Sequence, residues 1–428
     1  MWKYISILLT GVLISFYYFP FEFSFLPGVN TKMALAVVGL VIALLSLARR
    51  RVFKLPPNVF RITLIAVVVS LVGLTSVIIN NTPDFAYATY FVSMCVWLSA
   101  AYAVCSLIKI IHGELTIDLV TTYLTCVCVF QCIAALVIDS NVAVKNWVDT
   151  YIMQDQVMLT ELERIYGIGA SLDTAGVRFS ACLIFLAYVI NKQKADMGKW
   201  KMVFAIIAYV IIAVVGNMVA RTTIVGVGLS LIYAAMTFRP TNVSYGFMRF
   251  ARVALVTTAI AIPLSVYLYD NNAQFHELSR FAFEGFFNLF EKGEWQIDSN
   301  DKLKTMIVFP DNAKTWIIGD GYFSNPYYTD PYYVGYQPGG YYMGTDIGYC
   351  RFIFYFGIIG LIAFSFFFIS VAKECISVMS ENRTLILFIL LLGFVIWLKV
   401  ATDVFLVFAL LLCVGNMQED NSLMQISE

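Results

Sequence analysis

Two ionisable residues, Asp346 and Arg351, stand at the start of a long apolar run, in TDIGYCRFIFYFGIIGL (345–361). A charge at the edge of a membrane-spanning helix is costly unless it is paired or serves a function. A carboxylate can accept the proton of a hydroxyl group, and an arginine can orient it or stabilise a developing anion. We therefore interpret Asp346 and Arg351 as candidate catalytic residues. The alternative is that Asp346 caps the helix and pairs with Arg351.

A third candidate catalytic residue, Arg221, belongs to GNMVARTT (216–223). The stretch 200–238 is barely long enough for two membrane-spanning helices, so this segment must be a tight turn. Arg221 then lies at a helix N-terminus, where free N–H groups and the helix dipole favour an anion. Its guanidinium suits a phosphate or pyrophosphate, which it can bind through two N–H groups. The alternative is contact with lipid headgroups.

Three further ionisable residues are candidates for substrate binding. Arg164 and Asp173 belong to RIYGIGASLDTAG (164–176), and Arg178 lies about one turn inside the next apolar run. Arg178 could equally pair with a buried group such as Asp173, and Asp173 could simply cap its helix.

Tyrosines are concentrated in GYFSNPYYTDPYYVGYQPGGYYMG (321–344). A tyrosine offers a flat apolar face and a hydroxyl, a combination that suits sugar rings but also membrane interfaces. Tyr322 in this stretch, and Tyr349 just beyond it, are candidate substrate-binding residues.

The elements that must position these residues are membrane helices. The chain of 428 residues is 60% hydrophobic and 13% charged, so we expect an all-α integral membrane protein. The net charge of zero gives no basic face for nucleic acid. Two histidines make a His-built metal centre unexpected, and the nine cysteines lie mostly in apolar runs, where they fit core packing. We expect no cofactor.

We expect about twelve spans, each of about twenty apolar residues. They are 3–20, 28–48, 62–79, 87–111, 115–138, 174–190, 200–219, 221–238, 252–269, 347–370, 384–399 and 402–415. Lys and Arg collect in every second connection, which predicts that these connections and both termini are cytoplasmic. The opposite short connections carry almost no positive charge.

Two long connections fall on the outer side, so we expect the working face there. The expected regions are N-terminal helices 1–138, a first periplasmic loop 139–173, central helices 174–269, a large periplasmic loop 270–346, and C-terminal helices with a short tail, 347–428. In the large loop, ELSRFAFEGFFNLFEK (277–292) has the apolar spacing of an amphipathic helix that could lie on the membrane surface or cap a cavity.

Together, ARTTIVGVG (220–228), WIIGDGYFSN (316–325) and TDIGYCRFIFYFGIIGL (345–361) resemble the O-antigen polymerase and ligase family of bacterial membrane glycosyltransferases. The repeat-unit polymerases (Wzy type) are the closer match. The resemblance covers about half of the chain, 164–370. It implies a GT-C-like glycosyltransferase of the bacterial inner membrane. Such an enzyme polymerises undecaprenyl-pyrophosphate-linked repeat units on the periplasmic face, into O-antigen or capsular polysaccharide.

The same resemblance implies roles for individual residues. Arg221 corresponds to the arginine expected to hold the pyrophosphate, Arg164 to a second family arginine, and Arg280 to a third, with Lys302 and Lys304 as competitors. Ligases of the family commonly have a histidine where this chain has Asp346, which favours a polymerase. Membrane lipid and a chain-length regulator protein are the implied partners. A ligase, or a flippase or transporter for lipid-linked glycan, remains the alternative.

Overall fold

The computed structural model describes residues 2–50, 56–154, 159, 164–193, 198–237, 259–260, 262–325 and 340–427. Helices form most of this part of the chain, as expected. The helices of the first half are α1 (Trp2–Tyr18), α2 (Thr31–Arg50), α3 (Pro57–Asn80), α4 (Tyr90–His112), α5 (Ile117–Ser140), α6 (Val142–Tyr151), α8 (Leu172–Gln193) and α9 (Lys199–Val219). Those of the second half are α10 (Thr223–Thr237), α12 (Ala273–Ala282), α13 (Glu284–Lys292), α14 (Asp298–Thr305), α15 (Ala313–Ile318), α16 (Gly348–Val378), α17 (Arg383–Ile396) and α18 (Phe405–Ser427). Two short strands, β1 (Glu22–Phe23) and β2 (Ile152–Met153), pair antiparallel.

Six of the described helices are long and apolar enough to cross a membrane: 57–80, 90–112, 117–140, 172–192, 200–219 and 348–378. Four shorter apolar helices accompany them, at 2–18, 31–46, 223–237 and 405–419. A multi-pass, all-α membrane protein is therefore supported. Twelve spans stay a prediction, and most of the expected span 252–269 lies outside the described residues.

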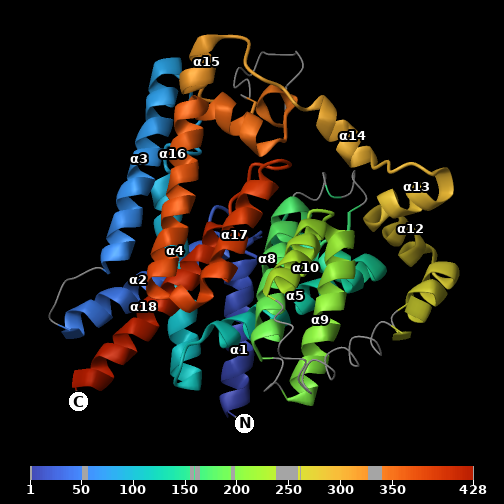
Figure 1. Ribbon diagram of the computed structural model, residues 1–428, viewed down its shortest axis with the longest axis horizontal. Coiled ribbons are helices and arrows are strands. Elements are labelled where there is room, and N and C mark those ends of the chain that lie inside the picture. The colour runs from blue at the N-terminus through green and yellow to red at the C-terminus, as the bar shows by residue number, and fades with distance from the viewer. Residues whose placement is uncertain are drawn as a thin grey trace.

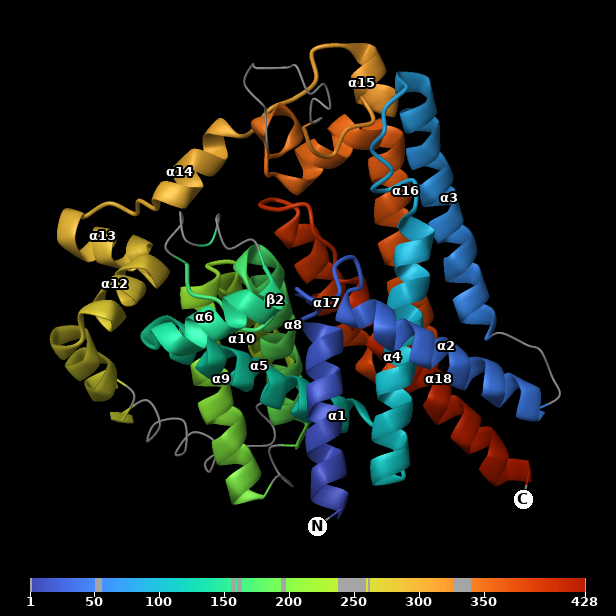
Figure 2. The same cartoon turned by 180° about the vertical axis from the view of Figure 1, so that it is seen from behind.

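The helices of the large loop run along the edge of the molecule (Figures 1 and 2). Both views show α3 and α16 side by side, with α15 over their shared end and the two chain termini at the opposite end (Figures 1 and 2). From the α15 end, α14, α13 and α12 form an arc that passes the ends of α8 and α10 and reaches the flank of α9, where α12 makes contact.

Helix α16 is broken at Phe356–Gly357, where Gly357 has a φ of 68°. The break frees the carbonyls of Phe354 and Tyr355, which accept hydrogen bonds from the backbone N–H of Asp320 (2.6 Å) and Gly321 (3.0 Å). A Cβ on Gly357 would come within 2.2 Å of the Ile317 carbonyl. The segment 317–321 therefore fills the break, and glycine is required at position 357 for both conformation and space.

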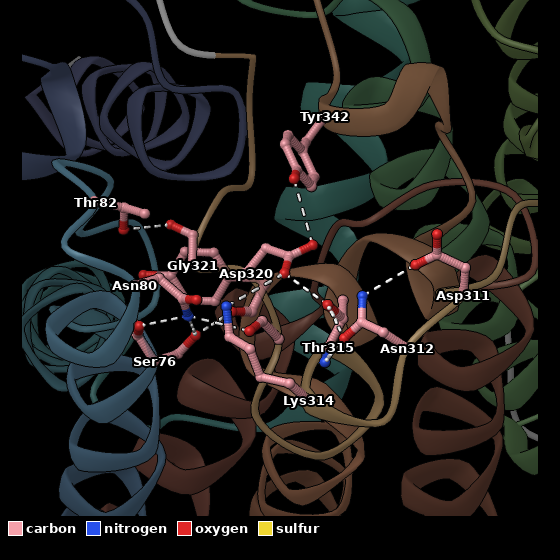
Figure 3. Close-up of polar contacts among 12 residues, drawn as sticks. Ser76, Asn80, Thr82, Asp311, Asn312, Lys314, Thr315, Asp320, Gly321 and Tyr342 are labelled. Atoms are coloured by element: carbon pink, nitrogen blue, oxygen red, sulfur yellow. Dashed lines mark hydrogen bonds and ion pairs between the residues drawn. The ribbon is translucent and has the colours of Figure 1, made fainter.

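Side chains extend this junction to α3 (Figure 3). Asn80 donates to the Gly319 carbonyl at 3.1 Å, and the Thr82 hydroxyl donates to the Gly321 carbonyl at 2.8 Å. The Asp320 carboxylate accepts from the Thr315 hydroxyl at 2.7 Å. The motif WIIGDG thus connects the large loop, α3 and the broken helix α16.

The expected helix over 277–292 is divided in two. Helix α12 ends at Ala282, Phe283 leaves the helical conformation, and α13 begins at Glu284. Gly285 lies against the side chains of Trp295 and Ile297, where a Cβ would come within 2.9 Å of each. The α13–α14 connection therefore folds back onto α13, which a straight helix would not allow.

We predict that Gly357→Ala lowers the free energy of unfolding by about 2–4 kcal/mol, because the new methyl group collides with the Ile317 carbonyl and the φ is unfavourable. The measurement is thermal unfolding of the purified protein in detergent. Gly11→Ala in α1 is the matched control, since no atom lies within 4 Å of its Cβ position. Equal unfolding temperatures for the two variants would contradict the packing described.

Candidate functional site

Arg221 lies in the three-residue turn between α9 and α10, as expected. Its guanidinium is held by the large loop: Nε donates to the Phe281 carbonyl at 2.9 Å, Nη1 donates to the Ser299 hydroxyl at 2.9 Å, and Nη2 forms an ion pair with Glu284 at 2.6 Å. One side chain therefore contacts α12, α13 and α14.

Arg164 and Arg221 both contact the ring of Phe281. The guanidinium carbons of Arg164 and Arg221 lie 3.6 Å and 3.9 Å from the centre of this ring. Burial, and then the charge of Arg221, lowers the pKa of Arg164 to about 10, while Asp173 and Glu284 oppose this. Two half-buried cations so close to one another favour an anion beside them.

Asp173, in the first turn of α8, pairs with Lys399 rather than with Arg178. The Lys399 ammonium donates to the Asp173 carboxylate at 2.7 Å and to the Thr222 hydroxyl at 2.8 Å. Thr222 in turn donates to Asp173. Since Thr222 follows Arg221 directly, this triad ties α8 and the α17–α18 connection to the turn that carries Arg221.

Asp346 precedes α16, and its Oδ1 is buried without a hydrogen-bond partner among the described residues. Burial, and next the charge of Asp173, raises its pKa to about 6, whereas Arg351 and Lys399 act in the opposite direction. The residue at the N-cap position of α16 is Ile347, with no side-chain cap. Among the described residues no ion pair within 4.0 Å joins Asp346 to Arg351. The alternative, that Asp346 caps α16 and pairs with Arg351, therefore finds no support.

Arg351 is buried, at 4% exposure, and is held by the large loop. Nη2 donates to the Phe323 carbonyl at 2.7 Å, and the guanidinium carbon lies 3.5 Å from the centre of the Phe323 ring and 4.0 Å from that of Tyr341. Its Nε is buried without a partner in the described part of the chain. Arg351 thus acts on Asp346 through its charge, without direct contact.

Two of the sequence-predicted arginines lie apart from this group. The guanidinium carbon of Arg178 lies 5.7 Å from the centre of the Phe19 ring, and the acidic residue that acts on its charge is Asp403 rather than Asp173. Arg280 forms a two-pronged ion pair with Glu291, with both contacts at 2.7 Å. Within the described part of the chain, no hydrogen bond or ion pair joins either guanidinium to the other candidate residues.

The candidate tyrosines pack against protein groups. The Tyr322 ring stacks on the Tyr342 ring, with 5.4 Å between the ring centres. Tyr342 in turn donates to Asp320 in the junction of Figure 3. The Tyr349 hydroxyl donates to the Phe394 carbonyl at 3.1 Å, on α17. The remaining predicted sugar-binding surface falls largely outside the described residues, which omit Tyr327, Tyr328, Tyr332, Tyr333 and Tyr336.

Sequence reasoning missed Lys399, Thr222 and Glu284. Lys399 had a usable signal: it is a lysine in a short connection expected on the outer side, and the other short connections expected there have almost no positive charge. Glu284 had none, because any acid on α13 could face the membrane or the solvent. Only the fold shows which one reaches Arg221.

Five candidate residues thus form one electrostatic group at the ends of α8, α10 and α16: Arg164, Asp173, Arg221, Asp346 and Arg351. The group combines cations that can hold an anion with a carboxylate that can exchange a proton near neutral pH. The described residues contain no cluster of three or more His, Cys, Asp or Glu that could hold a metal ion. Comparison with protein-family models, with curated proteins and with solved structures gave no match.

We predict that Asp346 is protonated below a pH of about 6 and reacts there with dicyclohexylcarbodiimide, which modifies protonated buried carboxyl groups. Mass spectrometry after labelling across pH gives the midpoint. Asp173→Asn should move the midpoint to lower pH, because it removes a negative charge that disfavours ionisation of Asp346.

Asp301, whose side chain is exposed and whose pKa is lowered by Lys304, serves as a negative control in the same digest and should stay unlabelled. Labelling of Asp346 no greater than that of Asp301, or a midpoint unaffected by Asp173→Asn, would contradict the described environment.

Proposed function

We propose that this protein is a membrane glycosyltransferase that moves a glycan from a lipid pyrophosphate donor to a sugar hydroxyl. It would act as a Wzy-type repeat-unit polymerase on the periplasmic face. One observation carries the proposal: the arginine pair beside Phe281 and Asp346, whose Oδ1 has no partner among the described residues, belong to one group linked through Asp173. In transfer from a pyrophosphate, cations stabilise the leaving group and a carboxylate accepts the proton of the acceptor hydroxyl.

The chemistry assigns a role to each part. The acceptor hydroxyl oxygen attacks the anomeric carbon of the donor, and the bond from that carbon to the pyrophosphate oxygen breaks. The departing undecaprenyl pyrophosphate takes the electron pair, and its growing negative charge is stabilised by Arg221 and Arg164. The Asp346 carboxylate takes the proton of the hydroxyl. A pKa of about 6 leaves most of this carboxylate ionised at neutral pH.

The Asp173–Lys399–Thr222 triad supports the two halves of the site. It connects the turn of Arg221 to Asp346, since Asp173 and Lys399 both act on the charge of Asp346. Lys399 neutralises the charge of Asp173, so the repulsion between Asp173 and Asp346 stays small. Loss of Lys399 would therefore raise the pKa of Asp346 and weaken it as a base at neutral pH.

A transporter or flippase and a glycosyltransferase differ in where along the membrane helices their charged residues are expected. Transporters and flippases commonly carry their charged site near the middle of the membrane, on interrupted helices. Helix α16 is also interrupted, at Gly357, but Asp173, Arg221 and Asp346 lie at or beside the ends of helices and not at this break, which favours chemistry at a membrane surface. A ligase of the same family would use the same cations, and the aspartate at position 346 favours the polymerase. The lipid-linked substrate, the chain-length regulator and the inner-membrane location remain parts of the proposal.

Asp346→Asn should lower the rate of transfer by roughly 10²–10⁴-fold, because an amide of the same shape cannot accept the proton. The measurement, in cells at matched protein level, is polymer length on gels together with the amount of lipid-linked single repeat units. We expect short or absent polymer and accumulated single units. Normal long chains would exclude Asp346 as the base.

Arg221→Ala should abolish polymer formation while the protein still accumulates in the membrane, and Arg221→Lys should restore only part of it. A lysine keeps the charge but lacks the planar fork that binds a phosphate through two N–H groups. Arg383→Ala, at the exposed start of α17, is the matched control and should polymerise normally. Full activity of Arg221→Lys would show that general positive charge suffices.

A further inference from the structure

All three nitrogen atoms of the Arg221 guanidinium contact the protein itself. Nε and Nη1 donate to the Phe281 carbonyl and the Ser299 hydroxyl, and Nη2 pairs with Glu284. The Arg221 and Glu284 side chains are only 17% and 18% exposed. A phosphate that approached this arginine would meet a guanidinium already engaged by a carboxylate.

Both carboxylate oxygens of Glu284 contact donors beside Arg221. Oε2 lies 2.6 Å from Nη2 of Arg221, and Oε1 accepts a hydrogen bond at 3.0 Å from the backbone N–H of Asp298, the first residue of α14. An arginine and a helix N-terminus are the donors that phosphate oxygens use in proteins. The carboxylate therefore satisfies the same donors that a phosphate would need.

We propose that Glu284 is an internal substitute for a phosphate group, and that a pyrophosphate binds Arg221 by displacing it. Displacement would release α13 and α14 from the α9–α10 turn. The inference rests on the proposed function and adds to it the means by which the large loop responds to the substrate.

Helix α12 has contacts that do not depend on Glu284. The Phe281 ring contacts both Arg164 and Arg221, and Asn217 of α9 donates to the Ala282 carbonyl at 2.6 Å. The non-helical Phe283 separates this anchored helix from α13. The movement therefore begins at Phe283, with α12 fixed and α13 and α14 displaced.

The competition has a thermodynamic consequence. A ligand that must first displace an internal carboxylate binds with an affinity reduced by the fraction of molecules in which the site is open. Removing the charge of Glu284 should therefore strengthen pyrophosphate binding, whereas a glutamate that only orients Arg221 would weaken binding when it is removed.

The test measures binding of inorganic pyrophosphate to the purified full chain in detergent by calorimetry. Glu284→Gln should bind roughly 3- to 10-fold more tightly than the wild type, in keeping with the loss of one charge-assisted contact. Glu294→Gln is the matched control: it removes one negative charge at an exposed position just after α13 and should leave the affinity unchanged. Undecaprenyl pyrophosphate, added in a parallel series, should bind more tightly than the inorganic ion if the natural ligand is lipid-borne.

A second readout follows the loop itself. In the wild type, pyrophosphate should increase hydrogen exchange of backbone amides in 284–305, because α13 and α14 lose the Arg221 contact. Unchanged or weaker binding by Glu284→Gln, or exchange that decreases with ligand, would overturn the inference while leaving Arg221 as an anion site. If neither the wild type nor Glu284→Gln binds more tightly than Arg221→Ala, both the inference and the proposed function are wrong.

Discussion

The break in α16 is the constraint on which the rest of the site depends. Inside a membrane protein, backbone carbonyls released from a helix must find other donors, because lipid offers none. The N–H groups of Asp320 and Gly321 meet this need at Phe354 and Tyr355. The large loop is therefore part of the membrane domain, and the short first piece of α16 is fixed in place with Asp346 and Arg351 at its start.

Around this framework, three cations of the site are held by other protein groups. Arg351 lies between two aromatic rings, Lys399 is paired with Asp173, and Arg221 contacts three helices of the loop. The Asp346 carboxylate differs from these cations: its buried Oδ1 has no hydrogen-bond partner in the described part of the chain, and the Nε of Arg351 shares this property. A polar atom left unsatisfied in this way is costly, and such atoms are commonly found where a ligand or a proton is exchanged.

The sequence allowed some of these features to be predicted because chain length alone determines them. The tight turn at Arg221 followed from the residues available for two spans, and the position of Asp346 followed from the start of an apolar run. Ion-pair partners could not be predicted in this way. Pairing of Arg178 with Asp173 was one of two alternatives for Arg178, yet Asp173 pairs with Lys399, 226 positions away in the chain. The division of the helix over 277–292 depends on Trp295 and Ile297 folding back against Gly285, a tertiary contact that apolar spacing does not encode.

The most direct test of the central claim, that this cluster transfers glycan from a lipid pyrophosphate, is a reconstitution. The purified protein would be placed in liposomes with lipid-linked repeat units extracted from the producing cells, and glycan length and free undecaprenyl pyrophosphate would be measured together. We expect longer glycans and the release of one undecaprenyl pyrophosphate for each new linkage. Lipid-linked units that cross the bilayer with unchanged length, and no release of undecaprenyl pyrophosphate, would contradict the account and identify a flippase.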